Sequence, residues 1–117
     1  MSLSPLKASA RHRNGIAIID LQGEINRMSE EPLNAAYADA TKQAVDKVLL
    51  NFGDVDYINS TGIAVIVGLL ARARKDGRSV TACGLSDHYR EIFEITRLSD
   101  FMTIFTDEEN ALTDVPA

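Results

Sequence analysis

The chain of 117 residues has little cysteine and no long apolar run, and each shortage excludes a class of protein. The single Cys83 rules out an intramolecular disulfide and a chelating cysteine pair, and it fits a reducing compartment. The longest apolar stretch, from Ile63 to Ala71, is far too short to span a bilayer. No apolar segment with a small-residue cleavage site follows the basic residues near the start, so no signal peptide is expected. These features predict a cytoplasmic protein without membrane insertion.

Basic side chains are also in the minority. Seventeen acidic residues against twelve lysines and arginines give a net charge of -5, which argues against nucleic acid or an anionic membrane as the main partner. Hydrophobic residues make up 45% and charged residues 25%, as in ordinary globular proteins. A chain of this length builds one core, so we expect a single domain over residues 1–117.

The motifs of common enzyme and metal sites are missing. The sequence holds no HExxH, no GxGxxG or GxxxxGK[ST] phosphate loop and no GxSxG elbow, and His12 and His88 lie far apart. We interpret the two histidines as surface side chains and Cys83 as a small buried hydrophobe. The prediction is a protein that is not an enzyme and has no metal site and no cofactor.

The first half of the chain contains clear turn and helix signals. Asn14-Gly15 suits a two-residue type I′ hairpin between strands at Leu6–His12 and Ile16–Gln22. The second strand is apolar on both faces, so it is expected to be covered on both sides. Ser29 is the expected N-cap of a helix that begins with acidic residues and Pro32. Its apolar positions have helical spacing and are Leu33, Ala36, Tyr37, Ala40 and Ala44.

The second half alternates strands with helices. A strand at Lys47–Phe52 should be broken by Gly53-Asp54, and Asp76-Gly77 should end a helix that starts near Ser60 and runs to Lys75. The remaining expected elements are a strand at Ser79–Cys83, a helix opened by Leu85-Ser86-Asp87, a strand at Thr103–Phe105 and a helix at Asp107–Leu112. This order predicts an α/β fold: a mixed, mostly parallel sheet of four to five strands, with an N-terminal β-hairpin and helices packed on the sheet.

The segment Asn59-Ser60-Thr61-Gly62 is the unusual part of the sequence. It places a polar group between a strand and an apolar helix, where Ser60 or Asn59 is expected to cap the helix. Spacing assigns one face of this helix, Ile63, Ile66, Val67 and Leu70, to the core. Val65 and Leu69 form a second stripe beside Gly62 and Gly68, which we expect to face another element or a partner, or to pair two copies in a homodimer.

A serine at the rim of such a surface suits a phosphate switch. The helix dipole and the free backbone N–H groups tolerate a phosphate at a helix N-terminus. The added charge, about -1.5 to -2, opposes the docking of an apolar partner surface.

Several motifs together resemble one family. Gly23-Glu24-Ile25-Asn26 is similar to its Gly-Glu-Leu-Asp, and the segment from Tyr57 to Ala64 is similar to its Phe-x-Asp-Ser-Ser-Gly-Leu-Gly. The strand from Val48 to Phe52, the later Gly77, the strand from Val80 to Cys83 and the segment from Arg90 to Phe93 also fit. The sequence therefore resembles the STAS domains, most closely the stand-alone anti-sigma-factor antagonists of bacteria.

The resemblance implies a switch mechanism. In that family an anti-sigma factor that is also a serine kinase phosphorylates the first serine of the signature, and a serine phosphatase resets it. The unphosphorylated form binds the kinase and frees its sigma factor. Carried over, Ser60 is the phosphoacceptor, with Thr61 less favoured. The expected partner-binding residues lie in the loop and the first turns of the following helix: Asn26, Asn59, Ser60, Thr61, Gly62, Val65 and Leu69.

Two departures from the family keep other functions open. Asn59 and Asn26 stand where the family has aspartates, so a kinase that reads either carboxylate would phosphorylate this chain slowly or not at all. The protein is then a constitutive binder or a divergent member. One alternative is a STAS subunit of another complex, in lipid transport by an ABC system or in a stress-signalling assembly, without a phosphate cycle. Another is a small-molecule-binding protein or an enzyme that uses the crevice of the fold.

Overall fold

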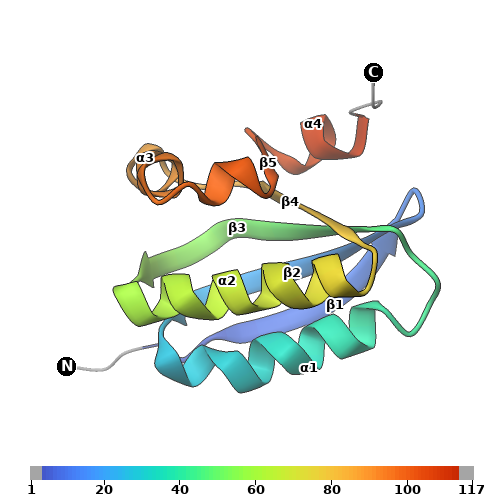
Figure 1. Ribbon diagram of the computed structural model, residues 1–117, viewed down its shortest axis with the longest axis horizontal. Helices are drawn as coiled ribbons and strands as arrows, with labels where there is room; N and C mark the ends of the chain where they lie inside the picture. Colours follow the sequence, from blue (N-terminus) through green and yellow to red (C-terminus); the bar gives the residue numbers. More distant parts are fainter. Residues whose placement is uncertain (1–3, 114–117) are drawn as a thin grey trace.

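A five-stranded mixed sheet runs through the computed structural model, which describes residues 4–113 (Figure 1). The strands lie side by side in chain order. β1 pairs with β2 in the antiparallel sense, and every later neighbour is parallel. The α/β architecture predicted from the element order is therefore confirmed. The strands are β1 (Lys7–Arg13), β2 (Ile16–Ile25), β3 (Lys47–Ile58), β4 (Ser79–Cys83) and β5 (Thr103–Phe105).

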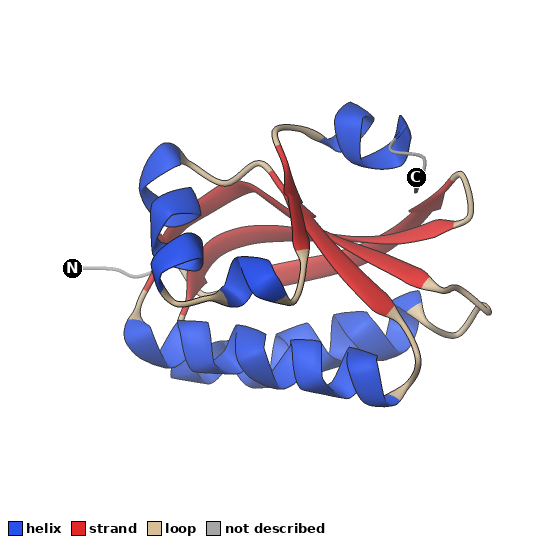
Figure 2. Cartoon of the chain, turned by 45° about the horizontal axis from the view of Figure 1, so that its top comes forward, coloured by secondary structure: helices blue, strands red, loops and turns tan. Residues whose placement is uncertain are grey.

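Helices cover both faces of this sheet (Figure 2). The α-helices are α1 (Glu30–Ala40), α2 (Ser60–Lys75), α3 (Asp87–Ile95) and α4 (Glu108–Thr113), and the 3-10 turns are η1 (Arg27–Ser29) and η2 (Leu98–Asp100). α1 and α2 run along one face, and the short α4 lies on the other. Within residues 4–113, every helix is too short or too polar to cross a lipid bilayer.

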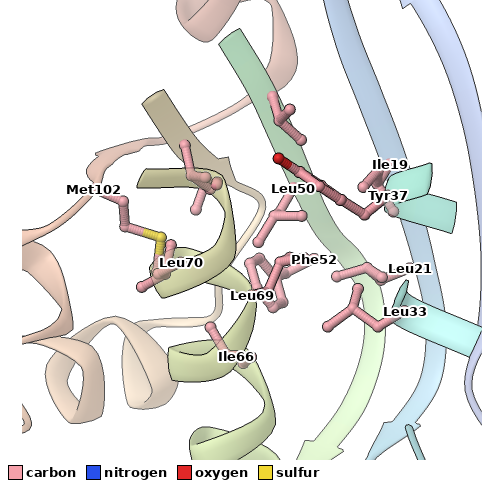
Figure 3. Packing of buried hydrophobic residues seen from close by; sticks show 14 of the residues in the cluster. Ile19, Leu21, Leu33, Tyr37, Leu50, Phe52, Ile66, Leu69, Leu70 and Met102 are labelled. Carbon is pink, nitrogen blue, oxygen red and sulfur yellow. The ribbon is translucent and has the colours of Figure 1, made fainter. Parts of the chain in front are cut away.

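The main core lies between the sheet and helices α1, α2 and α3. Figure 3 shows Leu50 and Phe52 of β3 gathered with Leu69 of α2. Phe93 of α3 joins the same cluster, with its ring edge against Phe52 at a centroid distance of 5.6 Å. Val48, Leu49 and Leu50 are fully inaccessible, so the predicted central strand is confirmed.

The opposite face has a smaller apolar cluster of Ile18, Leu49, Cys83 and Ala111, the last from α4. The second strand is thus covered on both sides, as its sequence predicted. Burial is the main cause that raises the pKa of the Cys83 thiol, to about 11. The thiol therefore stays protonated near neutral pH, in keeping with the interpretation of Cys83 as a small buried hydrophobe.

Charged side chains fasten α4 to this face. The Arg11 guanidinium donates to Asp20 over 2.6 Å and also contacts Glu108 of α4, with Nη1 3.0 Å from Oε2. Asn51 donates to the same Asp20 carboxylate over 2.9 Å, and Arg13 donates to Glu108 over 2.6 Å. The hydrogen bonds from Arg11 are the main cause that lowers the pKa of both Asp20 and Glu108.

Several element boundaries agree with the sequence prediction. Asn14 and Gly15 both have positive φ, 52° and 76°, as a type I′ hairpin requires. α2, β4 and β5 begin and end where predicted. α4 starts one residue late because Asp107 is its cap, with the Asp107 carboxylate accepting from the Asn110 amide over 2.8 Å.

Three local predictions are wrong. Gly53-Asp54 does not end β3, because pairing with β2 continues through a register shift as far as Ile58. The Ser29 side chain does not cap α1: it accepts from the Asn26 amide and donates to the Glu24 carbonyl. α1 ends at Ala40 rather than reaching Ala44, and the Thr41 hydroxyl donates to the Tyr37 carbonyl at its last turn.

Candidate partner-binding site at the β3–α2 junction

The residues singled out by the sequence meet at one edge of the sheet. Ile25 and Ile58, the last residues of β2 and β3, are register partners in the parallel pair. Asn26 and Asn59 directly follow them, so the two loops leave the sheet side by side. In open α/β sheets this carboxyl edge is where binding loops gather.

Asn59 is the cap of α2. Its backbone is extended, and its side-chain oxygen accepts from the Gly62 amide over 2.7 Å and from the Thr61 hydroxyl over 2.8 Å. Of the two expected capping residues, Asn59 is therefore the N-cap of α2. Ser60 is the first helical residue and is exposed, and its hydroxyl bonds to no group among residues 4–113.

Gly62 fixes the position of this helix end. A Cβ atom added at Gly62 would lie 2.2 Å from the Ile25 carbonyl oxygen, so no larger residue fits without moving the backbone. The Asn59 amide also donates to the Ile25 carbonyl, over 3.2 Å. The start of α2 is thus held against the end of β2, which places Asn26 and Ser60 at the same edge of the sheet.

Asn26 shapes its own loop. Its side-chain oxygen accepts from the Met28 amide over 2.8 Å, and its amide donates to Glu24 over 3.2 Å. Both polar ends of the half-buried side chain are therefore used within the loop. The neighbouring Met28 is 79% exposed and was missed by the sequence reasoning. Its signal was an apolar residue in a polar loop, outside any helical or strand periodicity.

The second stripe of α2 packs against another element of the fold, so the alternative that it faces a partner is wrong. Leu69 is 2% exposed, Gly62 is buried, and Val65 is half-buried against the main cluster. The stripe therefore cannot pair two copies of the chain, and Gly62 and Leu69 cannot touch a partner in this conformation. Val67, assigned to the core from its spacing, is 47% exposed.

The cause is an error in helical phase. The run from Ile63 to Leu70 is apolar on nearly every side, so periodicity alone leaves the inward direction open. The contact of Gly62 with β2 sets that direction. The buried line is then Gly62, Ile66, Leu69, Leu70 and Ala73, and the exposed line is Ser60, Ala64, Val67, Gly68 and Ala71.

Comparison with known proteins identifies the family. The family model described as STAS domain matches residues 7–111. The chain belongs to the STAS domain family. The resemblance seen in the sequence motifs is therefore confirmed. The prediction of a single domain over residues 1–117 stays a prediction, because the match stops short of both ends.

Named relatives of this STAS domain include regulators of sigma factors. BtrV of Bordetella bronchiseptica, named as a candidate anti-sigma factor antagonist, is 35% identical over 92 residues, which are 79% of this chain and 77% of BtrV. The anti-sigma-B factor antagonist of Bacillus subtilis is 30% identical over 94 residues, which are 80% of this chain and 85% of that protein.

Solved structures share the fold at lower identity. The anti-sigma factor antagonist SpoIIAA of Bacillus, in its unphosphorylated form, matches with a TM-score of 0.68 at 19% identity, over 94% of this chain and 99% of that one. The same protein in its phosphorylated form matches with a TM-score of 0.64 at 21% identity, over 89% and 96% of the two chains. The STAS fold is thus the same in both forms of that relative.

Proposed function

We propose that this STAS domain is an anti-sigma factor antagonist. In this proposal it binds an anti-sigma factor through the β3–α2 junction while Ser60 is unmodified, and phosphorylation of Ser60 ends the binding. The names of two relatives at 30% identity or more support the general function. That SpoIIAA has been solved with and without phosphate supports a modification cycle in the family.

The observation that carries the proposal is the position of Ser60. The residue is exposed at the start of a 16-residue helix, and Asn59 rather than Ser60 supplies the cap. A kinase can therefore take the hydroxyl as phosphoacceptor without breaking a hydrogen bond of the fold. The first amides of a helix have no partner within the helix, and they favour the phosphate that results. Thr61 is the less favoured acceptor because its hydroxyl already donates to Asn59.

The surface presented to the partner is apolar beside this serine. We call Met28, Ser60, Ala64, Val67 and Gly68 the switch surface; all five are exposed. Asn26 and Asn59 hold its two loops, and Gly62, Val65 and Leu69 support it from beneath. A phosphate at its rim adds charge that would lose water on docking, so the affinity for an apolar partner surface falls.

The protein acts in this scheme as a binding protein and not as an enzyme. The anti-sigma factor, acting as a serine kinase in the cytoplasm, transfers a phosphoryl group from ATP to Ser60, and a serine phosphatase removes it. Asn59 caps α2 without the negative charge of the family's aspartate. If the kinase needs that carboxylate, Asn59→Asp speeds the phosphorylation of this chain.

Intact-mass analysis tests the modification directly. We expect protein purified from its own host to carry one phosphate that phosphatase treatment removes and that Ser60→Ala abolishes. Thr61→Ala is the matched control and should keep the phosphate. Loss of the phosphate in Thr61→Ala with retention in Ser60→Ala would move the acceptor to Thr61.

Titration calorimetry against the cognate anti-sigma factor tests the switch. Ser60→Ala should bind as well as the wild type, because no contact of the fold is lost. Ser60→Glu should bind about a hundredfold more weakly or worse, since a desolvated, unpaired carboxylate costs several kcal/mol and every 1.4 kcal/mol is tenfold. Ser9→Glu adds the same charge on the exposed face of β1 and should leave the affinity unchanged.

Equal affinities of Ser60→Ala and Ser60→Glu would contradict the switch and leave a constitutive binder. A pull-down distinguishes an anti-sigma factor antagonist from a subunit of a transport complex. Recovery of a kinase and its sigma factor supports the proposal, whereas recovery of ATPase and permease subunits would assign the domain to a transport complex.

A further inference from the structure

A pocket of about 660 Å³ opens between the second half of α2 and the turn η2 that follows α3. We call it the α2–η2 pocket. Leu70, Val80 and Leu98 form its buried floor, and Val67 and Phe101 form its exposed walls. Phe101 is 62% exposed although it is the largest apolar side chain of the lining. A hollow of this size with apolar walls falls within the range of small-molecule sites.

The pocket lies away from Ser60. Ala71, which also lines it, follows Ser60 by eleven residues along α2, about 16 Å at 1.5 Å per residue. The pocket therefore lies along the second half of the helix, and Val67 is the one residue that it shares with the switch surface. A ligand there would not contact Ser60, so we expect its binding not to depend on the modification of Ser60.

The charge of the lining is opposite to that of the protein. Three arginines and one aspartate line the pocket, in a chain whose net charge is -5. Arg78 is engaged elsewhere, since it donates to the Val45 carbonyl and to the Tyr37 hydroxyl, both over 3.1 Å. Arg74 has no carboxylate within 4.0 Å among residues 4–113. Arg97 donates from Nε to Asp100 over 2.7 Å. Its two terminal nitrogens make no hydrogen bond among residues 4–113, so they and the Arg74 guanidinium are left to bind an anion.

The backbone at Arg97 adds an independent observation. Arg97 follows the end of α3 with φ 67° and ψ 15°, in the left-handed region. This position after a helix is usually glycine or asparagine, because other side chains are disfavoured there. Here the strained position holds a long guanidinium side chain at the mouth of an apolar pocket. Strained backbone of this kind clusters at binding sites.

We infer that the α2–η2 pocket binds a small anion with an apolar body, such as a medium-chain carboxylate. The carboxylate pairs with Arg97 and Arg74 at the rim, and the apolar body lies on Val67, Leu98 and Phe101. A soluble molecule is favoured over a lipid surface, because the net charge of the whole chain repels an anionic membrane.

Sodium decanoate, used below its micellar concentration, is the probe. In a titration of the ¹⁵N-labelled full chain we expect saturable shifts of the amide signals of Val67, Ala71, Arg97, Leu98 and Phe101. 1-Decanol has the same body without the charge, and it should bind at least tenfold more weakly. Decyltrimethylammonium reverses the charge and should give no saturable shifts at these residues.

Arg97→Asn is the decisive variant. Asparagine tolerates the left-handed backbone, so the fold is kept while the guanidinium is removed. The affinity for decanoate should fall at least tenfold. Arg90→Gln removes the same charge from an exposed position on α3 outside the pocket and should change the affinity less than twofold. Ala71→Trp fills the pocket from an exposed position and should abolish the shifts with the circular dichroism spectrum unchanged.

Four results would overturn the inference. They are equal affinities for decanoate and 1-decanol, an unchanged affinity in Arg97→Asn, and shifts centred on Met28, Ser60 and Ala64 instead of the pocket. The fourth is co-sedimentation with vesicles of phosphatidylcholine and phosphatidylglycerol at 3:1 but no shifts with free decanoate. This result would mean that the pocket binds a membrane surface and not a free anion.

Discussion

The two faces of the sheet are closed by different interactions. On one face α1, α2 and α3 pack an apolar core that includes Ile19, Leu50 and Phe93. On the other, α4 has six residues and packs its Ala111 on three buried residues of the strands, and ion pairs from Arg11 hold it in place. A helix this short is not stable by itself in water and buries little apolar area. On this face ion pairs therefore add to a small apolar contact, whereas the other face has a large apolar core.

Two neighbouring leucines give the largest expected difference between the faces. Leu49 and Leu50 are both fully buried, but they point to opposite sides of β3. We expect Leu50→Ala to lower the free energy of unfolding by about 4 kcal/mol and Leu49→Ala by about 2 kcal/mol, because the short α4 can move into the space left. Chemical denaturation of both variants measures this. Equal losses would mean that the two faces are equally well packed.

Removing the charge at the centre of the α4 face should have a smaller effect. Arg11→Met keeps most of the apolar stem and deletes the guanidinium that bridges Asp20 and Glu108. We expect a loss of about 1 kcal/mol, since partly exposed ion pairs contribute little individually and this one joins two carboxylates. Thermal melting detects this as a drop of roughly 5 °C. Arg13→Met, at the exposed end of the same cluster, is the control and should lose less.

The smallest effect is a pH dependence confined to the α4 face. Folding lowers the pKa of Asp20 and Glu108, whose ordinary values are 3.8 and 4.5. The stability from these pairs is therefore complete above about pH 4.5 and is lost as the pH falls through the lowered folded-state values. Below pH 4.5 the wild type should lose stability more steeply than Arg11→Met. The difference between their free energies of unfolding should therefore become smaller as the pH falls. Parallel curves in denaturation from pH 6 to pH 3 would argue against this assignment.

Much of the fold was readable from the sequence because its signals are local. The Asn14-Gly15 turn and the Asp76-Gly77 end of α2 each depend on backbone conformations that few residues adopt. The strand from Lys47 was predicted correctly at its start and wrongly at its end. Gly53-Asp54 has the composition of a turn, but pairing with β2, a non-local interaction, keeps it in the sheet.

The sequence identified residues of the candidate site but did not predict which side chains around it are exposed. The motif around Ser60 located the junction, and the choice between two capping residues needed the geometry of the Asn59 side chain. Which face of α2 is exposed depends on how Gly62 lies against Ile25, and the periodicity of one segment does not contain that information. Met28 was missed although it is an apolar residue in a polar loop, because its exposure depends on the cap that Asn26 gives to η1.

The contact between Gly62 and the Ile25 carbonyl has a kinetic consequence. A junction held this tightly has little freedom to lose when a partner docks, so association needs no prior rearrangement of the loops. We then expect single-step binding, in which the bound lifetime rather than the encounter rate responds to most changes at Ser60. Gly62, buried where α2 meets β2, would in this way make dissociation the step that responds to a change at Ser60.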